Sequence, residues 1–279
     1  FCSGAKKIHV DIDPAEVNKV IQPDVSLVGD ARLTIEDLLP LVEPNETRAW
    51  VKQCETWRRQ YPLKYAKRGG LRAQHVLDRL HVLTGGHAVI TADVGQHQMW
   101  AAQFCKTTGN RQWITSGGAG TMGFGWPAAI GAKLGRPESE VWAVVGDGGF
   151  QMTMSELATA AVNKVAARCL IINNNYLGMV RQWQELFYEN RLSGVDLEGN
   201  PDFVKLAEAY GIKALRITRP GDVDRKLKEA RAWKDGPVVV VAEVIKEDNV
   251  FPMIPAGAPV SHMIIEPPKH RLEKPVGST

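Results

Sequence analysis

A Gly-Asp-Gly sequence at residues 146–148 ends one apolar run, and two asparagines at 173 and 174 end the next. The two runs read VWAVVG and ARCLIIN, and such continuous apolar segments are typical of parallel strands that are buried on both faces. The spacing from Asp147 to Asn174 is enough for one right-handed crossover of a helix and a strand. We therefore expect both side chains at the carboxyl-end edge of the sheet, where open α/β proteins bind ligands.

The residue types at these positions narrow the chemistry. A carboxylate from Asp147 and an amide oxygen from Asn174 suit Mg²⁺, which prefers oxygen donors and shares its coordination shell with phosphate and water. The neighbouring Gly146, Gly148 and Gly149 leave room for a diphosphate, whose oxygens can accept backbone N–H bonds at a helix start. Each half alone also fits a plain turn or a helix cap. The two halves together, one crossover apart, predict a magnesium diphosphate site.

The elements that must position these residues alternate along the chain. β-branched runs predict strands at 87–94, 141–147, 167–173, 212–218 and 237–244. Helical spacing between them predicts helices at 73–84, 121–135, 154–164, 178–187, 201–211 and 222–233. The alternation predicts an α/β fold whose parallel sheet is covered by helices on both faces.

Changes of pattern divide the chain into four parts. A strand at 7–12 and an amphipathic stretch after it predict that residues 1–43 are the end of a second α/β domain. Residues 44–72 are charged and contain Pro62 and a Gly pair, so they are expected to be a linker segment. Residues 73–266 then form the ligand-binding domain, and the polar residues 267–279 a flexible tail.

Composition excludes several classes of protein. The chain has 279 residues, 44% of them hydrophobic, and a net charge of only +3, so it is expected to be globular and not to bind nucleic acid. Its four cysteines lie far apart, which argues against a disulfide framework and a zinc knuckle and favours a reducing compartment. Its apolar runs are too short to span a membrane, and the first residues do not predict a signal peptide.

Longer stretches around the two motifs resemble a known family. The motif pair is similar to the signature of thiamine-diphosphate enzymes, and the surrounding sequence resembles the large catalytic subunit of the acetohydroxyacid synthase (acetolactate synthase) family. The similar segments are VGQHQMWAAQ (94–103), TSGGAGTMGFGWPAAIGA (115–132), GDGGFQMTMSELATA (146–160), NNNYLGMVRQWQELFYENR (173–191) and FPMIPAGAP (251–259). They cover most of residues 90–260.

The resemblance implies a role for each matched residue. Mg²⁺ would be held by the side chains of Asp147 and Asn174 and the carbonyl of Tyr176. The cofactor would be bound by residues around the diphosphate and the two rings: Val94, Gly95, Gln96, His97, Met122, Gly146, Gly148, Gly149, Leu177, Gly178, Met179 and Val180. Within that set, Met122 matches the residue that bends the cofactor. Trp183 matches a tryptophan that narrows the substrate pocket and contributes to a herbicide-binding site. Outside this resemblance, His97 would be read as a structural histidine and the methionines as core filler.

The resemblance also implies an activity and its partners. Pyruvate would lose carbon dioxide on thiamine diphosphate and condense with a second pyruvate or with 2-ketobutyrate, giving precursors of branched-chain amino acids. Asp11, Gly29, Asp30 and Ala31 resemble the end of a domain that binds FAD. The glutamate that activates the cofactor ring is expected upstream of this sequence, so none of the residues present is expected to be that catalytic group. The chain alone is therefore expected to be inactive.

The family further implies at least a homodimer and, as a further partner, a regulatory subunit. We expect a cytoplasmic protein, or one in a plastid or mitochondrion after removal of a transit segment. Two alternatives stay open at this point. One is another thiamine-diphosphate enzyme of the pyruvate oxidase or glyoxylate carboligase type. The other is a noncatalytic cofactor-binding module.

Overall fold

A computed structural model describes residues 4–267 of the chain. The chain divides into two compact units. The smaller unit contains the residues up to 62 together with 256–262, and the larger unit contains residues 63–255 together with those from 263 onward. The domain boundaries expected from the sequence stay a prediction, and the expected tail, apart from its first residue, lies outside the described residues.

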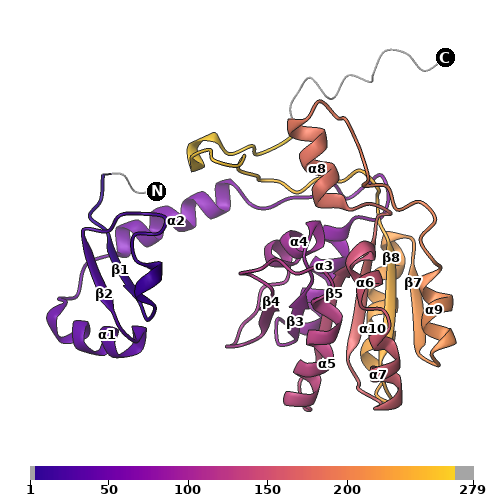
Figure 1. Ribbon diagram of the computed structural model, residues 1–279. Helices are drawn as coiled ribbons and strands as arrows, with labels where there is room; N and C mark the ends of the chain where they lie inside the picture. Colours follow the sequence, from indigo (N-terminus) through magenta and orange to yellow (C-terminus); the bar gives the residue numbers. More distant parts are fainter. Residues whose placement is uncertain (1–3, 268–279) are drawn as a thin grey trace. The chain divides into compact units, whose positions relative to one another are not determined.

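The larger unit is built on a six-stranded parallel sheet (Figure 1). Its spatial order is β4-β3-β5-β6-β8-β7, and every pairing is parallel. The strands are β3 (Val89–Ala92), β4 (Trp113–Thr115), β5 (Val141–Gly146), β6 (Arg168–Asn173), β7 (Lys213–Ile217) and β8 (Val238–Glu243). This arrangement confirms the α/β fold class expected from the sequence.

Helices bury both faces of this sheet. One face packs against α3 (Ala73–Thr84), α4 (Gln96–Phe104) and α10 (Val223–Ala232). The other packs against α5 (Gly125–Gly135), α6 (Asp147–Met152), α7 (Glu156–Val162) and α9 (Phe203–Ala209). The remaining helix of this unit, α8 (Gly178–Phe187), follows β6.

The alternation of side chains along β5 explains why its sequence is apolar throughout. Trp142 and Val144 belong to the core on one face, and Val141, Ala143 and Val145 belong to the core on the other. Successive side chains of a strand point to opposite faces, so a strand with helices on both sides needs an apolar residue at every position.

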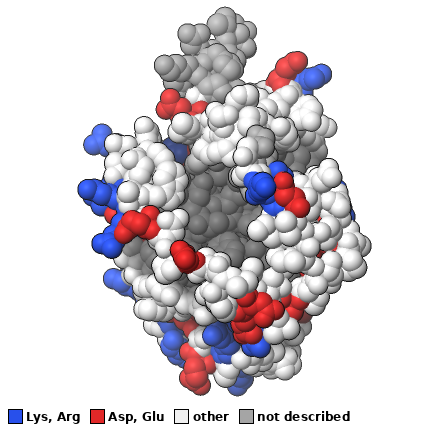
Figure 2. Space-filling model, turned by 90° about the vertical axis from the view of Figure 1, so that its left-hand side faces the viewer, with Lys and Arg blue, Asp and Glu red and all other residues white. Residues whose placement is uncertain are grey.

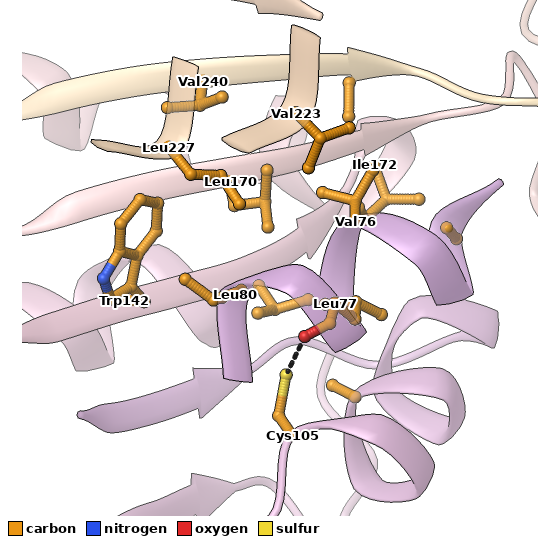
Figure 3. Close-up of a cluster of buried hydrophobic side chains, with 14 of the residues drawn as sticks. Val76, Leu77, Leu80, Cys105, Trp142, Leu170, Ile172, Val223, Leu227 and Val240 are labelled. Atoms are coloured by element: carbon orange, nitrogen blue, oxygen red, sulfur yellow. Dashed lines mark hydrogen bonds between the residues drawn. The ribbon is translucent and has the colours of Figure 1, made fainter. Parts of the chain in front are cut away.

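Figure 3 shows the first of these cores. Leu77 and Leu80 of α3 pack there with Trp142 of β5 and Leu170 of β6, all of them inaccessible to solvent. Cys105 lies at the rim, where its Sγ donates to the carbonyl oxygen of Leu77 over 3.5 Å. Burial raises the pKa of the Cys105 thiol to about 12, so it stays protonated and behaves as a small apolar side chain.

The smaller unit pairs two short parallel strands, β1 (Ile8–Asp11) and β2 (Val25–Val28). Two helices follow, α1 (Ala31–Leu38) and α2 (Arg48–Gln60). Short 3₁₀ turns lie at Pro14–Glu16, Leu39–Leu41 and Val260–His262. The residues of β2 are exposed, in contrast to the buried strands of the larger unit.

Four features of the larger unit differ from the sequence-based expectations. The edge strand β4 and the helices α4 and α6 were not predicted, because β4 has three residues, α6 has six, and α4 has no clear division into an apolar and a polar face. Helix α5 begins at Gly125 and not at residue 121, because Gly123 has a φ of +87° that a helix cannot continue.

On the face drawn in Figure 2, basic and acidic side chains lie next to each other in several groups. This agrees with the near balance of 34 basic and 31 acidic residues. Within residues 4–267, none of the helices has both the length and the apolar character that crossing a membrane would require.

Candidate functional site

The predicted metal and cofactor residues meet in one pocket at the carboxyl-end edge of the larger sheet. β5 and β6 are paired with Gly146 opposite Ile172, so the residues that follow these strands lie side by side. Together with the part that is open to solvent, the pocket contains about 450 Å³ of empty space. Its walls contain Trp100 and Ile172 and every residue that was predicted to bind Mg²⁺ or thiamine diphosphate: Val94, Gly95, Gln96, His97, Met122, Gly146, Asp147, Gly148, Gly149, Asn174, Tyr176, Leu177, Gly178, Met179 and Val180.

Asp147 is the buried carboxylate of this pocket, with 1% of its surface exposed. Burial raises its pKa to about 7, although N–H donors, including the Asn200 side chain, partly offset the shift. Asn200 Nδ2 donates to Asp147 Oδ2 over 2.8 Å. A cation beside the carboxylate would favour its charged form and remove the cost of burying it.

Asn174 faces the same pocket from the end of β6. Its Oδ1 accepts the backbone N–H of Tyr176 over 3.1 Å, and its Nδ2 donates to Gln96 Oε1 over 3.3 Å. These bonds fix the orientation of the amide. Among the described residues, no three His, Cys, Asp or Glu side chains gather as a metal-binding group. A set of one carboxylate, one amide oxygen and one backbone carbonyl suits Mg²⁺ that is also bound by phosphate.

Three helices begin at the pocket without a side-chain cap. Their N-cap residues are Gly95 for α4, Gly146 for α6 and Leu177 for α8. The first N–H groups of a helix lack partners within the helix and carry a partial positive charge. Three such ends around one pocket can bind the oxygens of a diphosphate.

Glycines bring the backbone close to neighbouring side chains around the pocket. A Cβ atom on Gly146 would lie 2.7 Å from His97 Nδ1, and one on Gly148 would lie 2.6 Å from Leu177 Cδ2. A Cβ on Gly149 would lie 2.5 Å from Asp93 Oδ1. Packing therefore requires glycine at 146 and 149, whereas the neighbour of Gly148 is the flexible end of the Leu177 side chain.

His97 lies buried against Gly146 with an unsatisfied ring nitrogen. Its Nε2 has no hydrogen-bond partner among the described residues. Burial lowers the pKa of His97 to about 4, although the charge of Asp93 acts in the opposite direction. The imidazole is therefore neutral near pH 7. A buried polar atom without a partner is costly, and a polar ligand in the pocket could satisfy it.

Gln96 connects the pocket to a network that the sequence did not reveal. Its Nε2 donates to Gln182 Oε1 over 2.8 Å and to the carbonyl oxygen of Asp248 over 2.9 Å. Gln182 is fully buried, and its amide makes two bonds to the backbone of Val250, of 2.8 and 2.9 Å. In the sequence, the only indication of this network was the pair Gln182 and Gln184 on helix α8.

Asp93 is a second residue that sequence reasoning missed. It follows β3, is fully buried, and accepts backbone N–H bonds from Val94, Gly123 and Gly125 at 2.8, 3.1 and 2.8 Å. These bonds hold the chain on either side of Phe124 and next to Met122. The sequence did contain an indication of its role, because Asp93 directly follows an apolar strand, as Asp147 does.

Trp183 lies apart from this pocket. It lines a separate surface pocket with Val180, Gln184, Tyr188 and Arg191, and its ring centroid is 4.9 Å from that of Phe187. Val180 lines both pockets.

The residues expected to contact FAD lie in the smaller unit. Asp30 is the N-cap of α1, where its Oδ1 accepts from the backbone N–H groups of Arg32 and Leu33 at 2.9 and 3.1 Å. Asp11 Oδ1 accepts the backbone N–H of Asp13 over 2.9 Å. Gly29 and Ala31 flank Asp30 in the turn, and the role of all four in FAD binding stays a prediction.

The fold and the pocket define a parallel α/β domain with its ligand site at the carboxyl ends of the strands. The family model described as "Thiamine pyrophosphate enzyme, C-terminal TPP binding domain" matches residues 93–242. The chain belongs to this thiamine pyrophosphate (thiamine diphosphate) enzyme family.

Several curated proteins that are similar to this chain are acetolactate synthases. An acetolactate synthase of Mycobacterium bovis is 46% identical over 269 residues, which cover 92% of this chain and 44% of that protein. The acetolactate synthase large subunit of Corynebacterium glutamicum is 45% identical over 92% of this chain and 43% of its own length. That of Haemophilus influenzae is 38% identical, with coverages of 96% and 48%. The chain thus spans about half the length of the curated relatives it matches.

Proposed function

We propose that this chain is the cofactor-binding part of an acetolactate synthase that uses thiamine diphosphate and Mg²⁺. One observation carries the proposal: Asp147 and Asn174 lie in one pocket with three uncapped helix starts. The pocket therefore offers oxygen donors for a cation beside N–H donors for an anion. A magnesium diphosphate needs both.

Each pocket residue has a proposed task. Asp147, Asn174 and the carbonyl of Tyr176 hold Mg²⁺. The diphosphate is bound by the neutral His97 side chain, by Gln96 and by the backbone of Val94, Gly95, Gly146, Gly148, Gly149, Leu177 and Gly178. Met122 would hold the cofactor in its reactive shape, and Met179 and Val180 would line its aminopyrimidine ring.

When bound, thiamine diphosphate supplies a thiazolium carbon that can act as a nucleophile and can accept the electron pair left by decarboxylation. The protein residues orient this carbon and exclude water from it. Trp100, Ile172 and Met122 give the pocket apolar walls. An apolar environment would favour decarboxylation, because the charged carboxylate of the substrate is lost as neutral carbon dioxide. Asp93 holds the Gly123 and Gly125 backbone in place, so the position of Met122 is set before the cofactor binds.

For the complete protein we propose pyruvate as donor and pyruvate or 2-ketobutyrate as acceptor. Trp183 would line the acceptor pocket and the herbicide site, and Asp11, Gly29, Asp30 and Ala31 would contact FAD. A glutamate outside this sequence would activate the cofactor ring, so the isolated chain would not turn over. A homodimer or higher oligomer, a regulatory subunit, and a location in the cytoplasm or in an organelle complete the proposal.

Calorimetric titration of the chain with thiamine diphosphate, with and without Mg²⁺, tests the cofactor site. Wild type should bind only when Mg²⁺ is present. Asp147→Ala should weaken this binding by about 100-fold or more, because it removes the charged partner of a buried cation. Asp30→Ala is the matched control, an aspartate in a similar turn of the smaller unit, and should bind as wild type does. Equal binding by all three proteins, or none by folded wild type, would refute the site.

A product assay on the complete protein separates the synthase from its relatives. Acetolactate formed from pyruvate alone supports the synthase. Acetyl phosphate from pyruvate, or a condensation product from glyoxylate, would instead assign the chain to the pyruvate oxidase or glyoxylate carboligase type.

A further inference from the structure

The side chain of Asn200 joins the two turns that carry the proposed metal donors. Its Nδ2 donates to Asp147 Oδ2 over 2.8 Å, after β5. The same atom lies 3.2 Å from Asn175 Oδ1 and 3.5 Å from Asn173 Oδ1, after β6. Asn200 is far from both turns in sequence and belongs to none of the motifs recognised there.

The other end of the Asn200 amide is also held. Its Oδ1 accepts from Gln151 Nε2 over 2.7 Å, and Gln151 lies on helix α6, which begins with Asp147. One side chain therefore bonds to the first residue of α6 and to a residue one turn later. This arrangement fixes the position of the amide relative to the carboxylate.

The backbone before Asn200 is bound to the segment after β6. Leu197 N donates to the carbonyl oxygen of Asn175 over 3.0 Å, and Leu177 N donates to that of Val195 over 2.8 Å. These bonds flank Tyr176, whose carbonyl is the third proposed metal donor. The loop carrying Asn200 thus runs alongside the donor segment and is bonded to it on both sides of Tyr176.

Asn200 is anchored from the other side as well. Two residues later, Asp202 caps helix α9 and pairs with Arg216. Arg216 also donates to Glu243 Oε1 over 2.6 Å, and Glu243 Oε2 accepts from Asn173 Nδ2 over 2.6 Å. These contacts lead from Asp202 to Asn173 at the end of β6, whose Oδ1 lies 3.5 Å from Asn200 Nδ2. Asn200 is therefore part of a closed ring of contacts, which the backbone between residues 200 and 202 completes.

We propose that Asn200 is a positioning residue that holds the Asp147 carboxylate in the geometry that Mg²⁺ requires, a role that rests on the proposed function. Mg²⁺ demands near-octahedral coordination at about 2.0–2.1 Å, whereas Ca²⁺ accepts longer bonds and variable geometry. Loss of the Asn200 amide leaves every metal donor in place but removes the side-chain hydrogen bond to Asp147 Oδ2, so the carboxylate is oriented by backbone N–H groups alone. Binding supported by Mg²⁺ should then suffer more than binding supported by Ca²⁺.

The test measures how thiamine diphosphate binding to the full chain depends on the concentration of Mg²⁺ and, separately, of Ca²⁺. Asn200→Ala should raise the Mg²⁺ concentration needed by roughly 10- to 100-fold, the usual effect of losing a residue that orients a metal ligand. The requirement for Ca²⁺ should rise less, so the preference for Mg²⁺ over Ca²⁺ should fall.

Two further variants make the test sharp. Gln151→Leu keeps Asn200 but removes one hydrogen bond that holds it, and should raise the Mg²⁺ requirement by about twofold to tenfold. It serves as the test should Asn200→Ala fail to fold. Asn163→Ala removes an exposed asparagine whose amide bonds only within its own helix end, to the Thr159 carbonyl oxygen, and should change nothing.

The outcomes separate the two proposals. Wild type that binds with Mg²⁺ and an Asn200→Ala protein with the same Mg²⁺ requirement would overturn the role of Asn200 and leave the proposed function standing. Equal losses with Mg²⁺ and Ca²⁺, together with a lower melting temperature of the metal-free chain, would show a purely structural role and also overturn it. Wild type without metal-dependent binding would overturn both.

Discussion

Two turns in this chain have almost the same sequence and opposite environments. Val28-Gly29-Asp30-Ala31 ends β2 and starts α1 in the smaller unit, and Val145-Gly146-Asp147-Gly148 ends β5 and starts α6 in the larger unit. Asp30 is exposed, whereas Asp147 is buried. The same three residues thus give a surface cap in one place and a buried carboxylate in the other.

The register of the helix start explains part of the difference. Asp30 is the N-cap of α1, and its side chain accepts two N–H groups of its own helix. Asp147 is already the first residue of α6, whose N-cap is Gly146, and its carboxylate accepts from the backbone of Gly148 in its own helix and also from Asn175 and Asn200, which lie on other segments. The start of α1 is therefore capped by its N-cap aspartate, whereas the N-cap of α6 is a glycine without a side chain.

The surroundings of Gly29 and Gly146, which precede the two aspartates, also differ: those of Gly29 are open and those of Gly146 are crowded. A Cβ atom on Gly29 would have as its nearest neighbour Thr34 Oγ1 at 3.7 Å, an ordinary contact. A Cβ on Gly146 would meet the His97 ring at 2.7 and 2.8 Å. Only the second glycine is required by packing. A short motif therefore indicates a site only when residues that are distant in sequence enclose it.

The largest expected effect concerns the histidine that encloses the buried turn. The pKa of His97 in the folded chain, about 4, lies below its ordinary 6.5, so in acid the unfolded chain takes up a proton that the folded chain does not. The free energy of unfolding should therefore decrease as the pH falls from 6.5 to 4, by about 3 kcal/mol from this residue. Urea titrations of wild type and His97→Gln across this range measure the difference.

Asp147 has the opposite effect on the free energy of unfolding. Its pKa is raised to about 7, so as the pH falls the folded chain binds a proton at Asp147 before the unfolded chain does. Both proteins in the His97 comparison retain Asp147, so its contribution cancels. A constant stability difference between wild type and His97→Gln from pH 6.5 to 4 would contradict the buried, neutral state of the imidazole.

The two glycines give the next effect. Gly146→Ala should lower the free energy of unfolding by about 2 kcal/mol, because the added methyl group displaces the His97 ring. Gly29→Ala should change it by less than about 0.5 kcal/mol. Chemical denaturation followed by tryptophan fluorescence checks both, and equal effects of the two substitutions would break the distinction between the turns.

A smaller effect is expected at the exposed turn. Asp30→Ala should destabilise α1 by about 1 kcal/mol through loss of its cap. Hydrogen exchange of the amides in Ala31–Leu38 should become faster, while that of α6 stays unchanged. Protection of α1 at the wild-type level would show that the cap bonds contribute nothing to its stability.

The smallest effect is expected outside the pocket. Trp183→Leu should alter the metal-dependent affinity for thiamine diphosphate by less than about twofold, because Trp183 lines a different pocket. Titration calorimetry of the chain checks this. In the complete protein, the same substitution should change the ratio of acetolactate to acetohydroxybutyrate. A large loss of cofactor affinity would place Trp183 in the cofactor site.

The sequence by itself determined the fold class and the edge at which the site lies. Apolar strands such as β5 must be covered on both faces, and parallel strands joined by right-handed crossovers end at one edge. These rules depend only on local sequence and on chain topology, so the proximity of Asp147 and Asn174 could be predicted from the sequence alone. The bounds of α5 and the existence of β4 escaped them, because a glycine turn and a three-residue strand leave little periodic signal.

The tertiary structure alone decided which side chains enclose and orient the site. Asp93, Gln182 and Asn200 carry no motif, and their roles follow from bonds to residues far away in sequence. It also decided that Asp147 is buried while Asp30 is exposed. Burial and hydrogen-bond partners depend on all the elements that pack around a residue, and a sequence pattern of four residues contains none of that information.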